Sequence, residues 1–309
     1  MMMRLAKIED EAELREIWKL AFGDEDSFIE LHFKNTDWVG RTAVLLEDGR
    51  NVSMLTMIPV ELVEKDGKKS KASMIYAVAT HPDFQKRGYS EALIGFGNRY
   101  LMSLQTEITL LVPATEDLFR FYGKRGYLPG FPVREAVLGV GEIEKLAGPD
   151  PHHFSFNPVL SDGYNRIRRC LLEGHSYVDY RDAEIDFQKK LALIADAGIF
   201  GINGGSKGEG CAYYERISQK EVLIKELLVT DGYEAAALKQ FAELVPAEKY
   251  IVRTPAYAGA VLGGSIRPFG MIRFNEGAEA IAPSGSAADS SNPTVPADRR
   301  EYYLGIAYD

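Results

Sequence analysis

The sequence predicts an α+β protein built as two consecutive units, in which mostly antiparallel strands are flanked by helices. Three observations support this prediction. In both halves of the 309-residue chain, apolar strand-like runs alternate with tight turns, helical patterns stand between some of the runs, and the order of these elements is similar. Strands joined by tight turns pair antiparallel, and helices among them indicate α+β rather than a doubly wound parallel sheet.

The first half begins with helical patterns and continues with strands. Leu14, Ile17 and Trp18 begin an apolar spacing typical of one helix face. Asp-Gly pairs at 48–49 and 66–67 favour hairpin turns between the first strands. After the first helix, the expected elements are a helix over 27–34, strands over 42–47, 52–63 and 72–80, a helix over 88–104, a strand over 108–112, a helix over 116–124 and a strand over 133–140.

One segment of the first half is expected to pair in parallel. Residues 72–112 follow the order strand, helix, strand, and a strand that follows a helical crossover lies parallel to the strand before it. The same segment therefore contains a junction at which a strand leads directly into a helix.

The second half repeats much of this order after a break over residues 148–151. The break reads Gly-Pro-Asp-Pro, which stops regular structure. It places one domain at 1–147 and a second at 152–309, and the shared order suggests a structural duplication. The glycine-rich residues 201–210 lie between two strand patterns, so they are expected to form a long hairpin turn. The other expected elements are helices over 162–173, 183–195 and 233–244, and strands over 199–203, 211–217, 221–230, 250–253, 271–274 and 302–307.

Composition and charge limit the class of function. The net charge of −9 argues against nucleic acid as the partner and suits a small cationic substrate through long-range attraction. No apolar run approaches the roughly 20 residues of a membrane helix, and the first residues lack an apolar signal core. Cys170 and Cys211 stand outside any ligand spacing, so we expect a cytoplasmic protein with free thiols and without a metal. The sequence leaves open whether the protein forms a homo-oligomer.

The junction after Thr80 is the segment richest in chemistry. A helix start exposes backbone N–H groups without internal partners and carries a partial positive charge, which together form an anion site. Gly88 lets the backbone approach an anion closely, and Lys86 and Arg87 add two positive charges in an otherwise acidic chain. The junction therefore predicts a pyrophosphate site formed by Gln85, Lys86, Arg87, Gly88, Tyr89 and Ser90.

This junction resembles the acetyl-CoA signature of the GNAT superfamily of N-acetyltransferases, Q/R-x-x-G-x-G/A. The sequence supplies Gln85, Gly88 and Ser90 at the three defined positions, and Ser90 departs from the pattern because serine is larger than glycine or alanine. The resemblance implies that acetyl-CoA is the acyl donor and that its pantetheine pairs with the open edge of the fourth strand. The strand residues that would pair with it are Val78, Ala79 and Thr80.

A second match follows downstream and is similar to the helix with which GNAT domains commonly end. Phe121-Tyr122 and Gly126-Tyr127 fit the pattern F-Y-x-x-x-G-F/Y. Thr115 stands where many members carry an Asn that contacts the cofactor. These features resemble the Eis-like branch, which implies tandem GNAT-like domains of which the second is degenerate. The second strand-to-helix junction, residues 227–236, lacks the motif and carries acidic residues, so we expect no cofactor there.

The resemblance also implies a direct transfer in which an amine attacks the thioester. Tyr122 is the candidate general acid, because a tyrosine pKa of about 10 lies above the roughly 8.5 of a thiol, and a strand amide near Ala79 or Thr80 is the candidate donor to the oxyanion. The strand offers no glutamate as a base; by analogy with the Eis-like branch, a terminal carboxylate at Asp309 is the candidate. His81 is expected to have a structural role in the turn after the strand.

Two functions remain open at this point. The first is an N-acetyltransferase that acetylates a primary amine of a small molecule or peptide. The second is a non-catalytic acyl-CoA-binding regulator, which the missing strand glutamate keeps open. Release of CoA with an amine substrate would distinguish the enzyme from the regulator.

Overall fold

The structure is a computed structural model that describes residues 1–150, 154–275 and 302–308. Its α+β architecture, with a mostly antiparallel sheet flanked by helices, confirms the predicted fold class. The first half contains β1 (Met2–Leu5), α1 (Glu11–Phe22), α2 (Asp26–Asn35), α3 (Trp38–Arg41), β2 (Thr42–Glu47), β3 (Arg50–Val63), β4 (Lys69–Thr80), α4 (Tyr89–Ser103), β5 (Ile108–Leu111), α5 (Glu116–Gly123), β6 (Leu128–Gly139) and α6 (Val140–Lys145). The second half contains β7 (Ser155–Pro158), α7 (Ser161–Leu171), β8 (Tyr177–Asp179), α8 (Asp182–Ile194), β9 (Ala197–Asn203), β10 (Glu209–Ser218), β11 (Glu221–Val229), α9 (Glu234–Leu244), β12 (Lys249–Pro255) and β13 (Ser265–Phe274).

The two halves share the duplicated topology that the order of elements predicts. Each half has three antiparallel strands, a helix and a further strand that lies parallel to the third: β2-β3-β4-α4-β5 and β9-β10-β11-α9-β12. The parallel pairing is short in both halves. It joins residues 72–74 to 108–110 in the first and residues 221–224 to 249–252 in the second. The third strand of each half therefore continues beyond its parallel neighbour.

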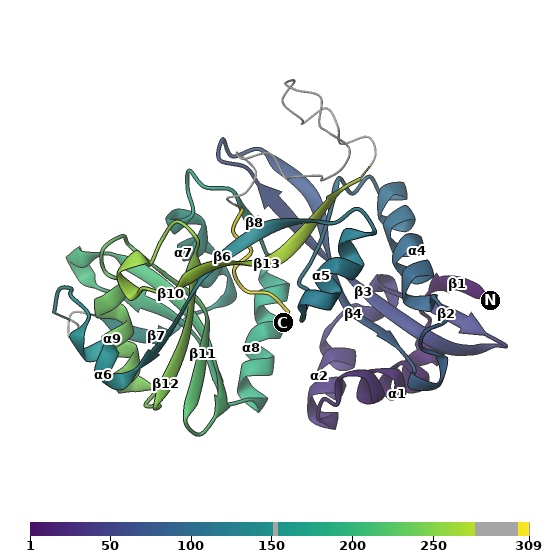
Figure 1. The fold of residues 1–309 in the computed structure, drawn as a ribbon, viewed down its shortest axis with the longest axis horizontal. Coiled ribbons are helices and arrows are strands. Elements are labelled where there is room, and N and C mark those ends of the chain that lie inside the picture. The colour runs from purple at the N-terminus through teal and green to yellow at the C-terminus, as the bar shows by residue number, and fades with distance from the viewer. Residues whose placement is uncertain (151–153, 276–301, 309) are drawn as a thin grey trace.

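The last strand of each half is exchanged with the other half. β13 pairs with β5, β6 pairs with β12, and β6 and β13 pair antiparallel with each other. Among the described residues, the result is one 13-stranded sheet with the order β1-β2-β3-β4-β5-β13-β6-β12-β11-β10-β9-β7, and β8 pairs with β3 outside this path. Figure 1 shows β6 and β13 bridging the two lobes. The boundary between 147 and 152 stays a prediction, because each half needs the other's last strand to complete its sheet.

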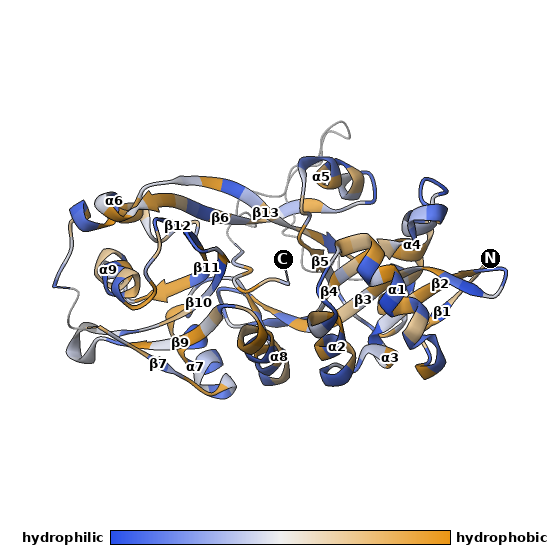
Figure 2. Ribbon diagram, turned by 90° about the horizontal axis from the view of Figure 1, so that it is seen from below, coloured by the Kyte–Doolittle hydropathy of each residue, from blue (hydrophilic) through white to orange (hydrophobic). Residues whose placement is uncertain are grey.

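Alternation along the strands explains the layers of the first half. Ala43 and Leu45 of β2 pack with Leu93 and Ile94 of α4, whereas Val44 lies in the cluster of α1 and α2. Successive strand side chains point to opposite faces, so the two helical layers cover opposite faces of the sheet. In the second half, Figure 2 shows α9 enclosed by the curved sheet, in agreement with its apolar contacts to β10, β11 and β12.

The expected strand over 302–307 is wrong. Tyr303 makes a single bridge to Tyr177, and Gly305 adopts a left-handed φ of 69° beside Arg168 and Glu226. Main-chain bonds between Tyr303 and its neighbours at 176 and 178 hold this buried segment instead. A strand needs a partner along its length, and here only one residue finds one.

The hairpin expectation for residues 201–210 is confirmed, because β9 and β10 pair antiparallel across that turn. Three short strands, β1, β7 and β8, escaped the sequence reading, since runs of three or four residues carry little periodic signal. Within the described ranges, no helix combines the length and apolar composition needed to cross a membrane.

Candidate active site

The predicted anion loop stands open between β4 and α4. After a short turn at 82–84, Gln85 to Gly88 are exposed and α4 begins at Tyr89. Gly88 has a φ of 78°, and Lys86, which is not a glycine, has a φ of 62°. No atom lies within 4 Å of a Cβ built on Gly88, so the left-handed backbone rather than crowding requires glycine here. Positive φ at Lys86 is uncommon for a residue with a side chain, and such conformations cluster at functional sites.

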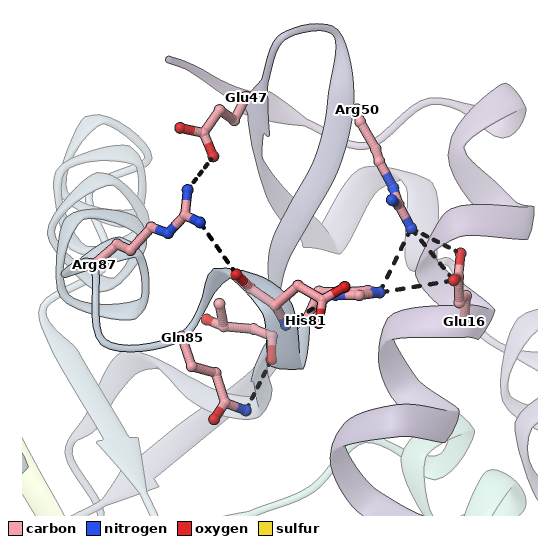
Figure 3. A network of polar contacts seen from close by, with 8 residues as sticks. Glu16, Glu47, Arg50, His81, Gln85 and Arg87 are labelled. Atoms are coloured by element: carbon pink, nitrogen blue, oxygen red, sulfur yellow. Dashed lines mark hydrogen bonds and ion pairs between the residues drawn. The ribbon is translucent and has the colours of Figure 1, made fainter.

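Side-chain bonds hold the loop in this shape. Gln85 Nε2 donates to the Thr80 carbonyl at 3.3 Å, and Arg87 Nη2 donates to the Asp83 carbonyl at 3.2 Å. Figure 3 shows Gln85 and Arg87 on either side of the turn, with Arg87 reaching Glu47. The sequence interpretation assigned both residues to the anion; the structure shows that their side chains also fix the loop.

Glu47 is a member of this site that the sequence reading missed. It accepts from Arg87 Nη1 at 3.3 Å and from Tyr89 Oη at 2.6 Å, so it offsets the charge of one of the two predicted cations. The bond to Glu47 raises the pKa of Tyr89. Lys86 makes no hydrogen bond or ion pair with any residue in the described part of the chain. Its ammonium is therefore the cation most available to a bound anion.

His81 serves the turn, as expected. Its side chain is 6% exposed, and its Nδ1 accepts a bond from the Asp83 amide at 3.3 Å. Its Nε2 lies 3.7 Å from Glu16 Oε1 on α1 and 3.5 Å from Arg50 Nη2 (Figure 3). The imidazole thus ties the end of β4 to the first helix.

The strand before the loop has an open edge. β4 pairs with β5 only over Ala72–Met74, so among the described residues its remaining length, 75–80, has no strand partner on the β5 side. Ala77 has a φ of 49°, and the register with β3 shifts at the same point, which marks a β-bulge. A bulge re-aims the main chain, and here it does so where the two strands diverge. This fork is the splayed edge that the resemblance implied.

The fork opens onto a cavity of about 690 Å³ that both halves line. Residues 74–78 of β4 and the chain after β5 form one wall, and α8 with strands β10 to β13 forms the other. Of the three predicted strand residues, Val78 lines the cavity, whereas Ala79 and Thr80 lie closer to the loop. The Ser53 hydroxyl donates to the Ala79 carbonyl at 2.7 Å and lies in hydrogen-bond contact with the Thr80 hydroxyl at 2.9 Å. The second half therefore supplies a wall of the cavity.

Tyr122 lies where α5 meets this cavity. Its side chain is 7% exposed, and burial raises its pKa to about 12 although nearby Arg125 lowers it. Its hydroxyl is therefore protonated throughout the neutral range. Thr115 caps α5, since its hydroxyl accepts from the Leu118 amide at 3.3 Å; a contact between Thr115 and the donor stays a prediction.

The predicted base, Asp309, lies outside the described residues. The preceding Tyr308 lines the cavity, with its ring 5.2 Å from Tyr76 and 6.0 Å from Phe187. Tyr308 Oη donates to Glu184 Oε2 at 3.3 Å. The chain therefore reaches the cavity one residue before the candidate carboxylate.

The equivalent junction of the second half is closed by the chain's own carboxylate. Glu234, at the first position of α9, accepts from the Gly232 amide at 3.0 Å and from the Gly259 amide at 3.3 Å. Glu234 is 7% exposed. Glu234 thus places a buried carboxylate at this helix start, bonded to one amide just before the helix and to one amide of a neighbouring loop. Among the described residues, no cluster of His, Cys, Asp and Glu has the form of a metal site.

Comparisons with known proteins agree with this geometry. Residues 2–130 match a family described as "Acetyltransferase (GNAT) domain". No curated protein matches the sequence.

Solved structures share the fold over most of the chain. A probable N-acyltransferase from Enterococcus faecalis is 17% identical with a TM-score of 0.68, covering 89% of this chain and 73% of that one. A GCN5-related N-acetyltransferase from Anabaena variabilis is 17% identical with a TM-score of 0.69, covering 88% and 72%. Eis1 from Mycobacterium abscessus is 11% identical with a TM-score of 0.64, covering 89% and 74%. At these identities the likeness shows the fold, which includes both halves.

Proposed function

We propose that this chain, which carries a GNAT acetyltransferase domain in its first half, transfers the acetyl group of acetyl-CoA directly to a primary amine of a small molecule or peptide. The observation that carries the proposal is the fork between β4 and β5. It has the exposed anion loop at one end and the cavity of about 690 Å³ at the other. A donor that binds the loop through its phosphates and follows the open strand edge would place its thioester at the cavity.

The loop would bind the pyrophosphate of the donor, and the strand edge would bind its pantetheine. Free amides at the start of α4, near Gly88 and Ser90, would bind the pyrophosphate, and Lys86 would add a positive charge. The main chain of residues 78–80 would pair with pantetheine, because this edge of β4 has no strand neighbour among the described residues. Ser90 is half-buried at the first turn and would sit under the phosphates.

In the chemical step, the neutral amine attacks the thioester carbonyl and forms a tetrahedral oxyanion. A main-chain amide near the bulge at Ala77, from Val78 to Thr80, is the proposed donor to that oxygen. Collapse of the intermediate expels the CoA thiolate. Over the whole reaction, the amine nitrogen loses one proton and the CoA sulfur gains one.

Tyr122 would serve the leaving thiolate mainly through a hydrogen bond. With its pKa raised to about 12, the hydroxyl stays protonated and donates. Full transfer of its proton to a thiolate of pKa about 8.5 would be uphill by about 5 kcal/mol, at 1.36 kcal/mol per pKa unit. The bond therefore stabilises the thiolate, and the proton lost by the amine can complete the thiol.

The base is the less defined half of the proposal. The segment of β4 that lines the cavity, Met74 to Val78, offers no carboxylate. We place the base at Asp309, and the support is that Tyr308 already lines the cavity.

The test is titration of the protein with acetyl-CoA, followed by thiol detection with a panel of primary amines. Saturable binding and release of CoA with at least one amine are expected. Binding without release across the panel would instead favour an acyl-CoA-binding regulator. Absence of acetyl-CoA binding would contradict both functions, and deletion of Asp309, which shifts the terminal carboxylate by one residue, should lower turnover without changing donor affinity.

A further inference from the structure

The charged side chains of the cavity are divided unevenly between its two walls. All three of its described basic residues, Lys225, Arg253 and Arg267, come from the second half. The described first-half residues that line the cavity include no Lys or Arg, and Asp24 is their only acidic residue. These three cations lie on β11, β12 and β13, and an acceptor that enters the cavity would come within reach of them.

Arg267 is the most accessible of these three cations. Its side chain is 37% exposed, compared with 12% for Arg253 and 7% for Lys225. Lys225 Nζ also lies 3.0 Å from Glu215 Oε2, so a cavity carboxylate already compensates its charge. Arg267 is therefore the cavity cation with the most side-chain surface open to a ligand.

Glu135 holds Arg267 in a fixed orientation. Arg267 donates from Nε to Glu135 Oε1 at 3.1 Å and from Nη2 to Oε2 at 2.5 Å, while Arg253 Nε donates to the same Oε2 at 3.0 Å. Partial burial raises the pKa of Glu135, but the bonds from Arg267 and Arg253 outweigh it and lower that pKa overall. The carboxylate thus stays ionised and orients both guanidiniums.

The guanidinium groups of Arg253 and Arg267 also lie over the ring of Phe269. The guanidinium carbon of Arg253 lies 4.8 Å and that of Arg267 lies 5.5 Å from the ring centroid. Arg267 also donates from Nη1 to the Pro268 carbonyl at 3.1 Å. A guanidinium has five N–H donors, so beyond these three bonds Arg267 keeps one N–H on each terminal nitrogen for a second anion. Because its rotamer is already fixed, Arg267 would lose little side-chain entropy when it does so.

We infer that the acceptor carries an acidic group, most simply a carboxylate, in addition to its amine, and that the basic wall receives it with Arg267 as the main contact. The inference rests on the proposed acetyl transfer and narrows the acceptor to compounds of amino-acid type. It also refines the expectation from net charge. The −9 of the whole chain attracts cations at long range, whereas the second-half side chains that line the cavity include three cations and one carboxylate, Glu215.

The test compares ligands that differ only in the carboxylate. Isothermal titration of the CoA-saturated protein with N-acetylphenylalanine, N-acetylleucine and N-acetylglutamate, and with the amides of the first two, avoids any difference in amine pKa. We expect at least one free acid to bind ten-fold or more tightly than its amide. Arg267→Gln should abolish that preference and leave the affinity for the amide within about two-fold, because a charge-assisted bond accounts for roughly ten-fold or more.

A matched control separates this contact from a general loss of charge. Arg166→Gln makes the same substitution at a side chain that is 63% exposed and outside the cavity, and it should keep the preference. Equal binding of acids and amides by the wild type, or no binding of any acid, would overturn the inference. Release of CoA with amines that lack a carboxylate would then show that acetyl transfer stands without it, whereas loss of acetyl-CoA binding would overturn the proposed function.

Discussion

The helices α4 and α9 begin at equivalent places in the two halves, but their first turns face different surroundings. At α4, the loop from Gln85 to Gly88 is exposed and Lys86 is available to an anion. At α9, the Glu234 carboxylate accepts two main-chain amides and is almost fully buried. The comparison teaches that the same strand–helix–strand topology can offer an anion site or fill it from within, and that a few side chains decide which.

The strands before these two helices also share their topology and differ in a few side chains. β4 has a bulge at Ala77 and β11 has a register shift at Lys225, both just beyond a short parallel pairing. In β4 the bulge carries a small apolar side chain, Ala77, which lines the cavity. In β11 it carries a lysine that lines the cavity. The second half therefore contributes a wall where the first contributes the fork.

The largest effect is expected when the first junction is given the feature of the second. Gly88→Glu would place a carboxylate at the start of α4 and force a side chain into a φ of 78°. We expect the Kd for acetyl-CoA, measured by titration calorimetry, to rise at least 100-fold, through repulsion of the phosphates and loss of the loop shape.

Gly174→Glu is the matched control for backbone strain. Gly174 has a φ of 80° and, like Gly88, no atom within 4 Å of a built Cβ. It lies outside the loop, so acetyl-CoA affinity should stay within about two-fold. A comparable loss in both variants would show that strain, and not the anion site, explains the result.

The next effect concerns Tyr122, on the first-half wall. Tyr122→Phe should lower kcat by roughly 100-fold and leave the Kd for acetyl-CoA unchanged, because only the thiolate-stabilising bond is removed. The raised pKa keeps this hydroxyl protonated at every pH below about 11. The dependence of kcat on pH from 6 to 10 should therefore have the same shape in the wild type and in the variant. An unchanged kcat would remove Tyr122 from the mechanism.

A smaller effect is expected from the charges around the anion loop. Lys86→Ala should raise the Kd for acetyl-CoA about ten-fold, the effect of one charge-assisted contact. Glu47→Gln should instead lower that Kd about three-fold, because it releases Arg87 from a compensating charge 3.3 Å away. Weaker binding in Glu47→Gln would mean that Glu47 acts mainly to shape the loop.

The smallest effect on the donor is expected at α9. Glu234→Gln should lower the free energy of unfolding by about 1 kcal/mol in urea titration, because it removes a charge at a helix start, and acetyl-CoA affinity should not change. A stoichiometry of two acetyl-CoA per chain in this variant would break the comparison, since it would show that Glu234 alone blocks a second site.

The sequence by itself determined the exposed loop between β4 and α4 and most element bounds. The loop could be predicted because its determinants are neighbours in the chain: a strand end, Gly88, two cations and a helix start. β2 was predicted to the residue and α4 to within one residue, since periodicity and turns are local signals. The donor half of the site follows from such local signals.

Only the tertiary structure decided the strand exchange and the acceptor side of the cavity. Arg267 and Glu135 are 132 residues apart, and Glu47 meets Arg87 across 40 residues, so no local pattern announces either pair. The expected strand over 302–307 failed for the same reason, because pairing depends on what lies beside a segment. Backbone conformation responds to adjacent residues, whereas strand partners and cavity walls are set by the packing of the whole chain.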